Sequence, residues 1–442
     1  MKATTVAPLN APLKGSICVS GDKSISHRAV LFAAMAKGTT RLSGVLDSQD
    51  VRATIQAVSQ LGAQVHLEKS PDGSLYGGIT GWGDVGPVEP DAPLDCGNSG
   101  TTARLMMGVL APWDIEVMLT GDASLCQRPM RRVIDPLMRM GVMVFPEGAE
   151  TLPLRIKGTR TLRPLTYTLP VASAQLKSAL LLAGLFAEGE TTITEPSHSR
   201  NHTELMLPEF GVTPQVAETT VTLRGPSVLH ACECIVPGDP SSAAFLVCAA
   251  ALKRGSAVQI ENVALNPSRL GFLRTLERMG LNVSCQSTGA VGKELVGILS
   301  AQYTEELYGC EVPAAAVPSL IDEIPVLALV AATAHGITVF RGIGELRVKE
   351  TDRIAGIMEG LTTLGISAWT EGDDLYIEGD PDLMVKASTV LDSHGDHRLA
   401  MTWALVGLCG DVPVEVVNLD SFGVSYPRFI LNMRTLALGN KQ

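Results

Sequence analysis

The sequence predicts a two-domain α/β (α+β) protein in which one unit of strands plus two helices is used six times. The first observation is a serine that lies in a short polar stretch and precedes an apolar run rich in alanine and leucine. This serine recurs at intervals of 68 to 78 residues, at Ser24, Ser99, Ser173, Ser241, Ser319 and Ser393. A regular period of this kind is the sequence signature of a repeat architecture.

A second marker runs in phase with the serines. It is a glycine that closes a helix-like segment and precedes a short β-like run, at Gly62, Gly141, Gly211, Gly280 and Gly365. Glycine is favoured just after a helix because it adopts the left-handed conformation without strain. The two markers together indicate strands plus two helices in each unit.

Two similar segments indicate how the chain divides. The segments that start at Val19 and Val236 both place Gly-Asp and a serine-containing turn before an apolar helix. Three of the six serines lie between Val19 and Val236, and the other three lie after Val236. We therefore predict one continuous domain at residues 22–238 and a second domain that joins residues 1–21 to residues 239–442. A linear array of six units is the alternative, but solenoid repeats are usually shorter, about 20 to 50 residues.

The composition limits the class of protein. Of the 442 residues, 45% are hydrophobic and 18% are charged, which is typical of a globular chain with large cores. No apolar run approaches the roughly 20 residues of a membrane-spanning helix, and the N-terminal residues lack a signal-peptide pattern. Nine scattered cysteines without a CxxC pair favour reduced thiols over disulfides or structural zinc. A net charge of −11 argues against a nucleic-acid partner. We expect a cytoplasmic protein with no membrane or nucleic-acid partner.

The serine segments are candidate anion sites, because a helix start directs free backbone N–H groups outward. In GDKSISHR, Lys23 and Arg28 add positive charge where it is unfavourable unless an anion joins it. Ser24 or Ser26 is expected to cap the following helix. The alternative is a pair of ordinary surface cations. The spacing does not match a P-loop, so nucleoside triphosphate binding is not indicated.

The next segments offer further anion ligands. GNSGT provides an amide, hydroxyls and glycines, and Arg128 precedes Pro129, a residue suited to the first turn of a helix. An arginine held at a helix start can bind a carboxylate or phosphate with two parallel hydrogen bonds. In SRNHTE, a helix-capping role for His202 is favoured over catalysis. GDPSSAAF contains no cation and is interpreted as a structural hinge.

The last two repeats carry the candidates for proton transfer. Asp322 and Glu323 open a strongly apolar helix, where an acid beside buried surface suits general base catalysis, with helix stabilisation as the alternative. In KETDR, a helix would place Lys349 and Arg353 on one face, and a surface salt-bridge cluster is the alternative.

The sixth serine segment contains two histidines, in SHGDHR. Two histidines three residues apart make only a weak zinc motif without a third ligand nearby.

Cations therefore accompany five of the six helix starts of an acidic chain. If the two domains face each other, this pattern predicts a cleft that binds one or two small polyanions and closes around them to exclude water. A carboxylate inside such a cleft would transfer protons during group transfer. A non-catalytic repeat protein that binds small anions is the alternative.

Nine motifs between Gly21 and Pro427 resemble, in order, those of the 5-enolpyruvylshikimate-3-phosphate synthase family of enolpyruvyl transferases. They are GDKSISHR, GNSGT, RPMRRV, SAQLKS, SRNHTE, GDPSSAAF, LIDEIPVL, ELRVKETDRI and DHRLAM. The resemblance implies the two-domain enolpyruvyl transferase fold, with three βαβαββ units per domain and the active site in the cleft between the domains.

The resemblance also implies an activity in the shikimate pathway, which leads to chorismate and the aromatic amino acids. The enolpyruvyl group of phosphoenolpyruvate would move to the 5-hydroxyl of shikimate 3-phosphate through a tetrahedral intermediate, with release of phosphate. No metal or organic cofactor is implied, and we expect a monomer.

Site residues are implied where this sequence matches the family motifs. Those for shikimate 3-phosphate are Lys23, Ser24, Arg28, Ser173, Ala174, Gln175, Arg200, Asp322 and Lys349. Those for phosphoenolpyruvate are Lys23, Asn98, Gly100, Arg128, Gln175, Arg353 and Arg398. The implied catalytic residues are Lys23, Asp322, which accepts the 5-hydroxyl proton, and Glu350, which protonates the methylene carbon and later removes a proton.

Two positions depart from patterns within the family. Val424 stands where some members have a lysine that contacts phosphoenolpyruvate, and Gly100 stands where some glyphosate-tolerant members have alanine. The glycine predicts sensitivity to glyphosate. The related UDP-N-acetylglucosamine enolpyruvyl transferases, the alternative enzyme, usually carry a cysteine at the position of Ala123, whereas the nearest cysteine here is Cys126.

Overall fold

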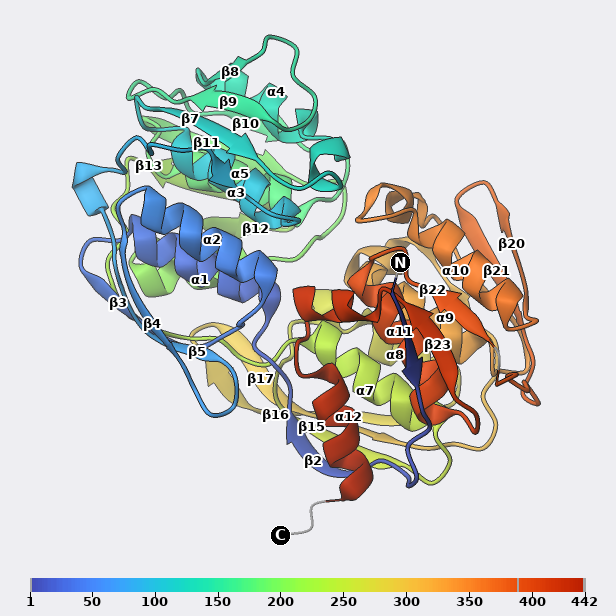
Figure 1. The fold of residues 1–442 in the computed structure, drawn as a ribbon. Coiled ribbons are helices and arrows are strands. Elements are labelled where there is room, and N and C mark those ends of the chain that lie inside the picture. The colour runs from blue at the N-terminus through green and yellow to red at the C-terminus, as the bar shows by residue number, and fades with distance from the viewer. Residues whose placement is uncertain (1, 388, 440–442) are drawn as a thin grey trace. The chain divides into compact units, whose positions relative to one another are not determined.

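The computed structural model describes residues 2–387 and 389–439, which alternate between strands and short helices (Figure 1). Close contacts divide the chain into two units. Unit 1 comprises Met1–Ser20, Pro237–Ala290 and Leu295–Gln442, and unit 2 comprises Gly21–Val236 and Val291–Glu294. The crossings at residues 20/21 and 236/237 lie one to two residues before the boundaries that the sequence predicts. The assignment of residues 291–294 to unit 2 is not indicated by the sequence pattern.

Unit 2 contains three four-stranded sheets with one topology. In each sheet the first two strands are parallel and the other neighbours are antiparallel. The parallel pair needs a helical connection, whereas a tight turn joins the antiparallel pair. The strand orders are β14 (Glu233–Ile235), β3 (Thr39–Val45), β5 (Leu75–Thr80), β4 (Gln64–Lys69); β6 (Leu94–Asp95), β7 (Glu116–Thr120), β9 (Leu154–Lys157), β8 (Met143–Phe145); and β10 (Thr166–Thr168), β11 (Gly189–Thr194), β13 (Thr220–Gly225), β12 (Gln215–Ala217).

Unit 1 has the same topology in two sheets and a shortened form in the third. The orders are β2 (Lys14–Cys18), β15 (Ala257–Ala264), β17 (Glu294–Gln302), β16 (Asn282–Val291); β18 (Glu311–Val312), β19 (Gly336–Phe340), β21 (Asp374–Gly379), β20 (Ser367–Glu371); and β22 (Val390–Asp392), β23 (Val414–Val417), β1 (Ala3–Val6). In the third sheet, β1 takes the antiparallel place beside β23. The predicted α/β fold with six repeats is confirmed, with the sixth repeat lacking its final hairpin.

The two crossings exchange the first strands of two repeats. β2 precedes α1 (Lys23–Met35) along the chain, yet it pairs with β15 in unit 1. β3, which follows α1, takes its parallel neighbour β14 from much later in the sequence. The backbone is tightly packed where unit 2 begins, since a Cβ on Gly21 would lie 2.0 Å from the carbonyl oxygen of Gly44. Glycine is therefore required at this position.

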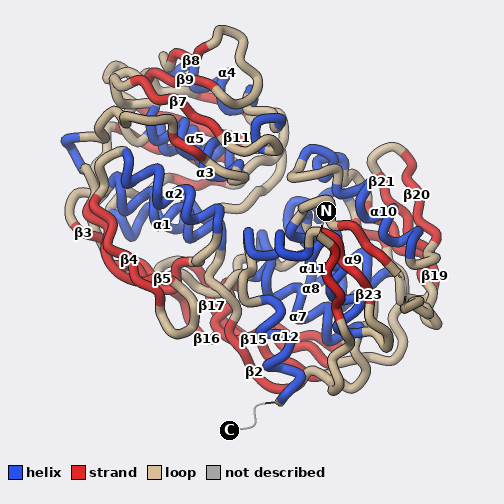
Figure 2. The backbone as a smooth tube through the Cα atoms, viewed as in Figure 1, coloured by secondary structure: helices blue, strands red, loops and turns tan. Residues whose placement is uncertain are grey.

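Each repeat contains one helix that is apolar on nearly all sides, and such a helix has to lie in the interior. The sheets of each unit lie around these helices (Figure 2). In unit 2, α3 packs against α1 and α5, and in unit 1 the three inner helices pack against one another. The inner helices are α1, α3 (Gly100–Leu110), α5 (Ala174–Gly184), α7 (Pro240–Leu252), α9 (Ile324–Ala331) and α11 (His397–Cys409).

Each repeat also contains a second helix. These helices are α2 (Gln49–Gln60), α4 (Arg131–Met140), α6 (His202–Met206), α8 (Gly271–Arg278), α10 (Arg353–Thr363) and α12 (Phe429–Leu438). The five glycines that mark the repeats lie just beyond the ends of these helical segments, and all five have positive φ, between 85° and 111°. The sequence marker thus corresponds to a left-handed turn that most other residues adopt only with strain.

The caps of the inner helices differ in part from the prediction. Asp22 caps α1 by accepting a 2.8 Å hydrogen bond from the backbone N–H of Ile25, so the expected cap by Ser24 or Ser26 is wrong. The Ser26 hydroxyl instead accepts a hydrogen bond from the N–H of Leu46. An aspartate that precedes the serine has the same advantage at a helix start and adds a favourable negative charge.

A long hairpin of β16 and β17 belongs to unit 1, but its tip, Val291–Glu294, is counted with unit 2. The Glu294 carboxylate lies 2.5 Å from Nδ1 of His202, and both side chains are buried. Gly292 at the tip has a φ of +56°, and a Cβ there would overlap the carboxylate of Glu209. The tip is therefore fitted closely to unit 2.

The bulk expectations can be compared with the described residues. None of the helices formed by residues 2–387 and 389–439 is both long and apolar enough to cross a membrane. All nine cysteines are free thiols, as expected from their spacing.

Candidate functional site

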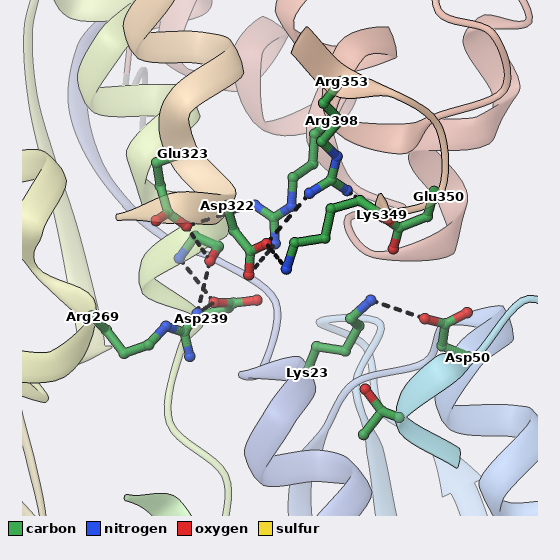
Figure 3. Close-up of polar contacts among 12 residues, drawn as sticks. Lys23, Asp50, Asp239, Arg269, Asp322, Glu323, Lys349, Glu350, Arg353 and Arg398 are labelled. Atoms are coloured by element: carbon green, nitrogen blue, oxygen red, sulfur yellow. Dashed lines mark hydrogen bonds and ion pairs between the residues drawn. The ribbon is translucent and has the colours of Figure 1, made fainter. Parts of the chain in front are cut away.

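The start of α1 holds the first candidate cation in an ion pair. Lys23 is the first residue of α1, and its Nζ lies 2.9 Å from Oδ2 of Asp50 on α2 (Figure 3). The Lys23 side chain is 17% exposed and the Asp50 side chain 6%. The conflict between a cation and a helix start is thus met by a carboxylate from the neighbouring helix. No sequence motif indicated Asp50, because it lies in an ordinary amphipathic segment.

Arg28, one turn further along α1, is buried and makes three hydrogen bonds. Its Nε donates to Oγ1 of Thr203 at 2.8 Å, Nη1 to the carbonyl of Ser24 at 2.9 Å, and Nη2 to Oγ of Ser178 at 2.6 Å. Burial lowers the pKa of Arg28 to about 10, Glu204 opposes this shift, and the positive charge of Arg200 adds to it. Arg28 remains charged at neutral pH and connects α1 with α5 and the SRNHTE segment.

Arg128 is held beside the start of α3. Its Nη2 donates to Oδ1 of Asn98 at 2.6 Å and to Oγ of Ser124 at 3.2 Å, and Nη1 donates to the carbonyl of Asn98 at 3.1 Å. The expectation that Arg128 and Pro129 open a helix is wrong, because α4 begins at Arg131. The arginine is positioned by the loop before α3 and not by the backbone of its own helix.

Gln175 forms a second contact at the start of α3. Its Nε2 donates to Oγ1 of Thr101 at 2.9 Å, and its Oε1 accepts a 2.8 Å hydrogen bond from Nη1 of Arg104. Ser173 caps α5, on which Gln175 lies, by accepting from the N–H of Leu176. The sequence analysis missed Arg104, although this residue lies on α3 only a few residues after the GNSGT motif.

A buried lysine connects α5 with the SRNHTE segment. Nζ of Lys177 lies 2.6 Å from Glu195 and 2.7 Å from Glu204, and all three side chains are at most 4% exposed. Ser199 donates a hydrogen bond to the same Glu195. His202, the first residue of α6, is fixed by Glu294, so this histidine is a structural residue of the segment that carries Arg200.

In unit 1, three cations converge on Asp322 (Figure 3). Its Oδ1 lies 3.4 Å from Nη1 of Arg353 and 3.8 Å from Nζ of Lys349, and its Oδ2 lies 3.5 Å from Nη2 of Arg398. Asp322 lies in a 3₁₀ turn, Ile321–Glu323, that leads into α9. Three segments that the sequence singled out separately, those of Asp322, of Lys349 with Arg353, and of Arg398, thus meet at one carboxylate.

Arg353 is the centre of this cluster. Its Nε lies 2.7 Å from Asp396 and its Nη2 lies 2.6 Å from Glu350, while its side chain is only 1% exposed. Burial alone would lower the pKa of Arg353, but the carboxylates of Asp396, Glu350 and Asp322 hold it above its usual value. The arginine therefore stays charged.

The KETDR segment is not helical as a whole. Lys349 follows a 3₁₀ helix, Gly344–Val348, and α10 begins only at Arg353, with Asp352 as its cap. The expected shared helix face of Lys349 and Arg353 is therefore wrong. The two side chains meet through Asp322 instead.

The exposed edge of the cluster differs from its base. The side chains of Lys349, Glu350 and Asp322 are 31%, 21% and 13% exposed, whereas Asp396 is fully buried. Asp396 thus contacts Arg353 from the buried side, and Lys349, Glu350 and Asp322 are the partly exposed groups of the cluster.

The two late histidines do not gather with other metal ligands. His394 is paired with Glu359 at 2.9 Å, and no group of three histidine, cysteine, aspartate or glutamate residues with metal-binding geometry occurs among the described residues.

The family model described as EPSP synthase (3-phosphoshikimate 1-carboxyvinyltransferase) matches residues 9–433. The chain belongs to the EPSP synthase family. It is therefore an enzyme of the transferase class. The family supports the activity on shikimate 3-phosphate that the sequence resemblance implies. It does not support the two alternatives, a UDP-N-acetylglucosamine enolpyruvyl transferase and a non-catalytic repeat protein.

Individual relatives match over nearly the full length. The 3-phosphoshikimate 1-carboxyvinyltransferase of Acidiphilium cryptum is 46% identical over 427 residues, which cover 96% of this chain and 94% of the relative. That of Halorhodospira halophila is 45% identical over 434 residues, covering 98% and 96%.

Solved structures agree with this family assignment. An EPSP synthase from Acinetobacter baumannii superposes with a TM-score of 0.84 at 38% identity and covers 98% of this chain and 97% of that one. The enolpyruvyl transferase NikO from Streptomyces tendae gives a TM-score of 0.76 at 18% identity, which shows the fold alone.

Proposed function

We propose that this family member transfers the enolpyruvyl group of phosphoenolpyruvate to the 5-hydroxyl of shikimate 3-phosphate and releases phosphate. The observation that carries the proposal is the convergence of Lys349, Arg353 and Arg398 on Asp322. This convergence supports the proposal, because cations beside the expected proton acceptor suit the phosphate and carboxylate groups of both substrates.

The residues proposed for phosphoenolpyruvate are those that match the family motifs. In unit 2, Arg128 is oriented by Asn98 beside Gly100, and guanidinium groups match carboxylate and phosphate oxygens. In unit 1, Arg353 and Arg398 would serve the same substrate. The proposed set is Lys23, Asn98, Gly100, Arg128, Gln175, Arg353 and Arg398.

Shikimate 3-phosphate would be bound chiefly at the starts of α1 and α5. Arg28 fixes the Ser24 carbonyl and contacts α5, so it joins the two helix starts whose N–H groups favour a phosphate. The proposed set is Lys23, Ser24, Arg28, Ser173, Ala174, Gln175, Arg200, Asp322 and Lys349.

The proposed reaction is an addition followed by an elimination. The 5-hydroxyl oxygen bonds to C2 of phosphoenolpyruvate as Asp322 takes the hydroxyl proton. Glu350, which has to be protonated when this step begins, gives its proton to C3. In the second step the C2–O bond to phosphate breaks, Glu350 takes a proton back from C3, and the proton on Asp322 passes to the departing phosphate. Lys23 would neutralise charge on the substrates, and both carboxylates lie at the exposed edge of the cluster, where substrates reach them.

The cations are already paired in this structure, so substrates have to exchange with carboxylates. Arg398 and Lys349 are bound to Asp322 at 3.5 and 3.8 Å, longer than ideal charge-assisted hydrogen bonds. Anionic groups of the substrates would take over these contacts and leave Asp322 available to the 5-hydroxyl.

Phosphate release with both substrates tests the proposal. We expect turnover by the unmutated chain and a decrease in kcat of about a hundredfold or more in Asp322→Asn and in Glu350→Gln, the range of general acid–base catalysis. Asp373→Asn, an exposed carboxylate of unit 1, is the control and should retain full turnover. Near-normal turnover of either active-site variant would show that its assigned role is wrong.

We further propose that the chain works as a cytoplasmic monomer. The absence of a spanning helix among the described residues is compatible with this. Light scattering of the purified chain, with and without substrates, would measure the oligomeric state, and a dimer mass would exclude the monomer.

A further inference from the structure

The start of α7, which carries the fourth serine, is contacted by a cation that the GDPSSAAF segment itself does not contain. Arg269, from the 3₁₀ turn Pro267–Arg269, reaches it and is 3% exposed. Its Nη2 lies 2.9 Å from Oδ1 of Asp239, the cap of α7, and donates a 2.7 Å hydrogen bond to Oγ of Ser241. A cation from a later loop thus supplies what the GDPSS segment lacks.

Ser241 also forms a hydrogen bond to a buried glutamate. Its hydroxyl donates a 2.5 Å hydrogen bond to Oε1 of Glu323, which is 1% exposed. The same Oε1 lies 3.6 Å from Nη1 of Arg398. Oε1 of Glu323 therefore connects the Ser241 hydroxyl with the Arg398 guanidinium that we assign to phosphoenolpyruvate.

Arg398 forms ion pairs with two carboxylates that are neighbours in sequence. Asp322 faces its Nη2 and Glu323 faces its Nη1. These two carboxylates differ in their surroundings, because the Asp322 side chain is 13% exposed and touches two more cations, whereas Glu323 is buried and held by Ser241. When substrate displaces Asp322, Glu323 remains as the fixed contact of the arginine.

We propose that Arg269, Ser241 and Glu323 are positioning residues that fix Arg398 for phosphoenolpyruvate. Arg269 holds the Ser241 hydroxyl, Ser241 orients Oε1 of Glu323, and Glu323 sets the direction of the guanidinium. None of the three is assigned a substrate contact. The inference rests on the proposed function, in which Arg398 binds phosphoenolpyruvate.

Ser241→Ala tests the chain of contacts with little change in volume. The cap of α7 survives, because Asp239 accepts from the backbone N–H of residue 241 and not from the hydroxyl. Ser242→Ala is the matched control, since Ser242 is equally buried on the same helix and takes no part in these contacts. The measurement is KM for each substrate, kcat by phosphate release, and the melting temperature.

We expect Ser241→Ala to raise KM for phosphoenolpyruvate about tenfold, the scale of a lost hydrogen bond to a charged group. KM for shikimate 3-phosphate should stay within about twofold, as should both KM values of Ser242→Ala. Equal changes in both KM values, or a Ser241→Ala variant that behaves like the control, would overturn the proposal.

A second variant covers the case in which Ser241→Ala fails to fold. Arg269→Lys keeps the charge, but the lysine side chain is too short to bring its amine to the place of Nη2, the one atom that serves both Asp239 and Ser241. It should therefore give the same selective rise in KM for phosphoenolpyruvate. An unchanged KM would overturn the proposal. Failure of the proposed function is distinguishable, because then the unmutated chain itself would release no phosphate.

Discussion

Asp396 provides a direct test of how the buried base of the cluster stabilises unit 1. One carboxylate oxygen caps α11 by accepting from the N–H groups of Arg398 and Leu399 at 2.8 and 3.3 Å. The other lies 2.7 Å from Nε of Arg353. Asp396→Asn keeps an oxygen for the cap and removes the charge, whereas Asp396→Ala removes both.

The magnitude follows from these contacts. Breaking a buried ion pair costs about 3 to 5 kcal/mol. Arg353 retains Glu350 at 2.6 Å and Asp322 at 3.4 Å, so its charge is not stranded and we expect the low end for Asp396→Asn, about 3 kcal/mol. Loss of the cap adds about 1 kcal/mol in Asp396→Ala. Asp352→Ala removes the cap of the next helix, α10, together with an exposed ion pair to Arg347 that contributes little, and should cost about 1 kcal/mol.

Equilibrium urea unfolding followed by circular dichroism measures these differences, provided that the slope of the transition is unchanged among the variants. The relevant transition is the cooperative unfolding of unit 1, to which Asp352 and Asp396 belong. A cost below about 1 kcal/mol for Asp396→Asn, or equal costs for Asp396→Ala and Asp352→Ala, would refute the reasoning that the ion pair dominates.

Three further changes test other contacts. Lys177→Met leaves two buried glutamates without their cation and should lower stability in urea unfolding by about 3 kcal/mol or more, and an unchanged midpoint would contradict this. Burial and two neighbouring cations, Lys23 and Arg28, hold the pKa of His27 well below its ordinary value of 6.5, so the unfolded chain binds a proton that the folded chain does not bind. Stability should therefore fall as the pH drops below 6.5, by up to about 1.4 kcal/mol per pH unit, and His27→Leu should flatten that dependence; identical slopes would refute the assignment. A Cβ on Gly100 would lie 2.7 Å from Nη1 of Arg104, a flexible side chain that can move aside. We expect glyphosate to inhibit the unmutated chain in the micromolar range and Gly100→Ala about tenfold or more weakly, and tolerance of the unmutated chain would contradict this.

The repeat period could be predicted because its markers act locally. A helix often ends in a left-handed turn, and that turn favours glycine whatever the rest of the fold does. All five marker glycines have positive φ. The inner helices could be predicted for a similar reason, since a run without polar residues has to be buried.

The details of helix starts were less predictable, because several residues compete to cap one helix. Asp22 outcompetes two nearby serines at α1. In KETDR, the aspartate before Arg353 begins a new helix and separates Lys349 from it. Single-residue preferences at such positions differ by only a few tenths of a kcal/mol.

Partners that come from distant segments were not predictable from one sequence. Asp50 pairs with Lys23 across a gap of 27 residues, and Arg269 reaches Ser241 across 28. Nothing in the local pattern of an amphipathic helix or a short turn identifies such a residue. Its role exists only once the fold brings it to the same place.

The hairpin tip at Val291–Glu294 limits how the two units can be separated by genetic engineering. A fragment cut at the two obvious crossings would contain His202 without Glu294, the group that satisfies it in the interior. A chimera that exchanges residues 21–236 between two relatives would have to transplant residues 291–294 as well. Although the repeats look like interchangeable modules, neither unit is encoded by the segments that its crossings delimit.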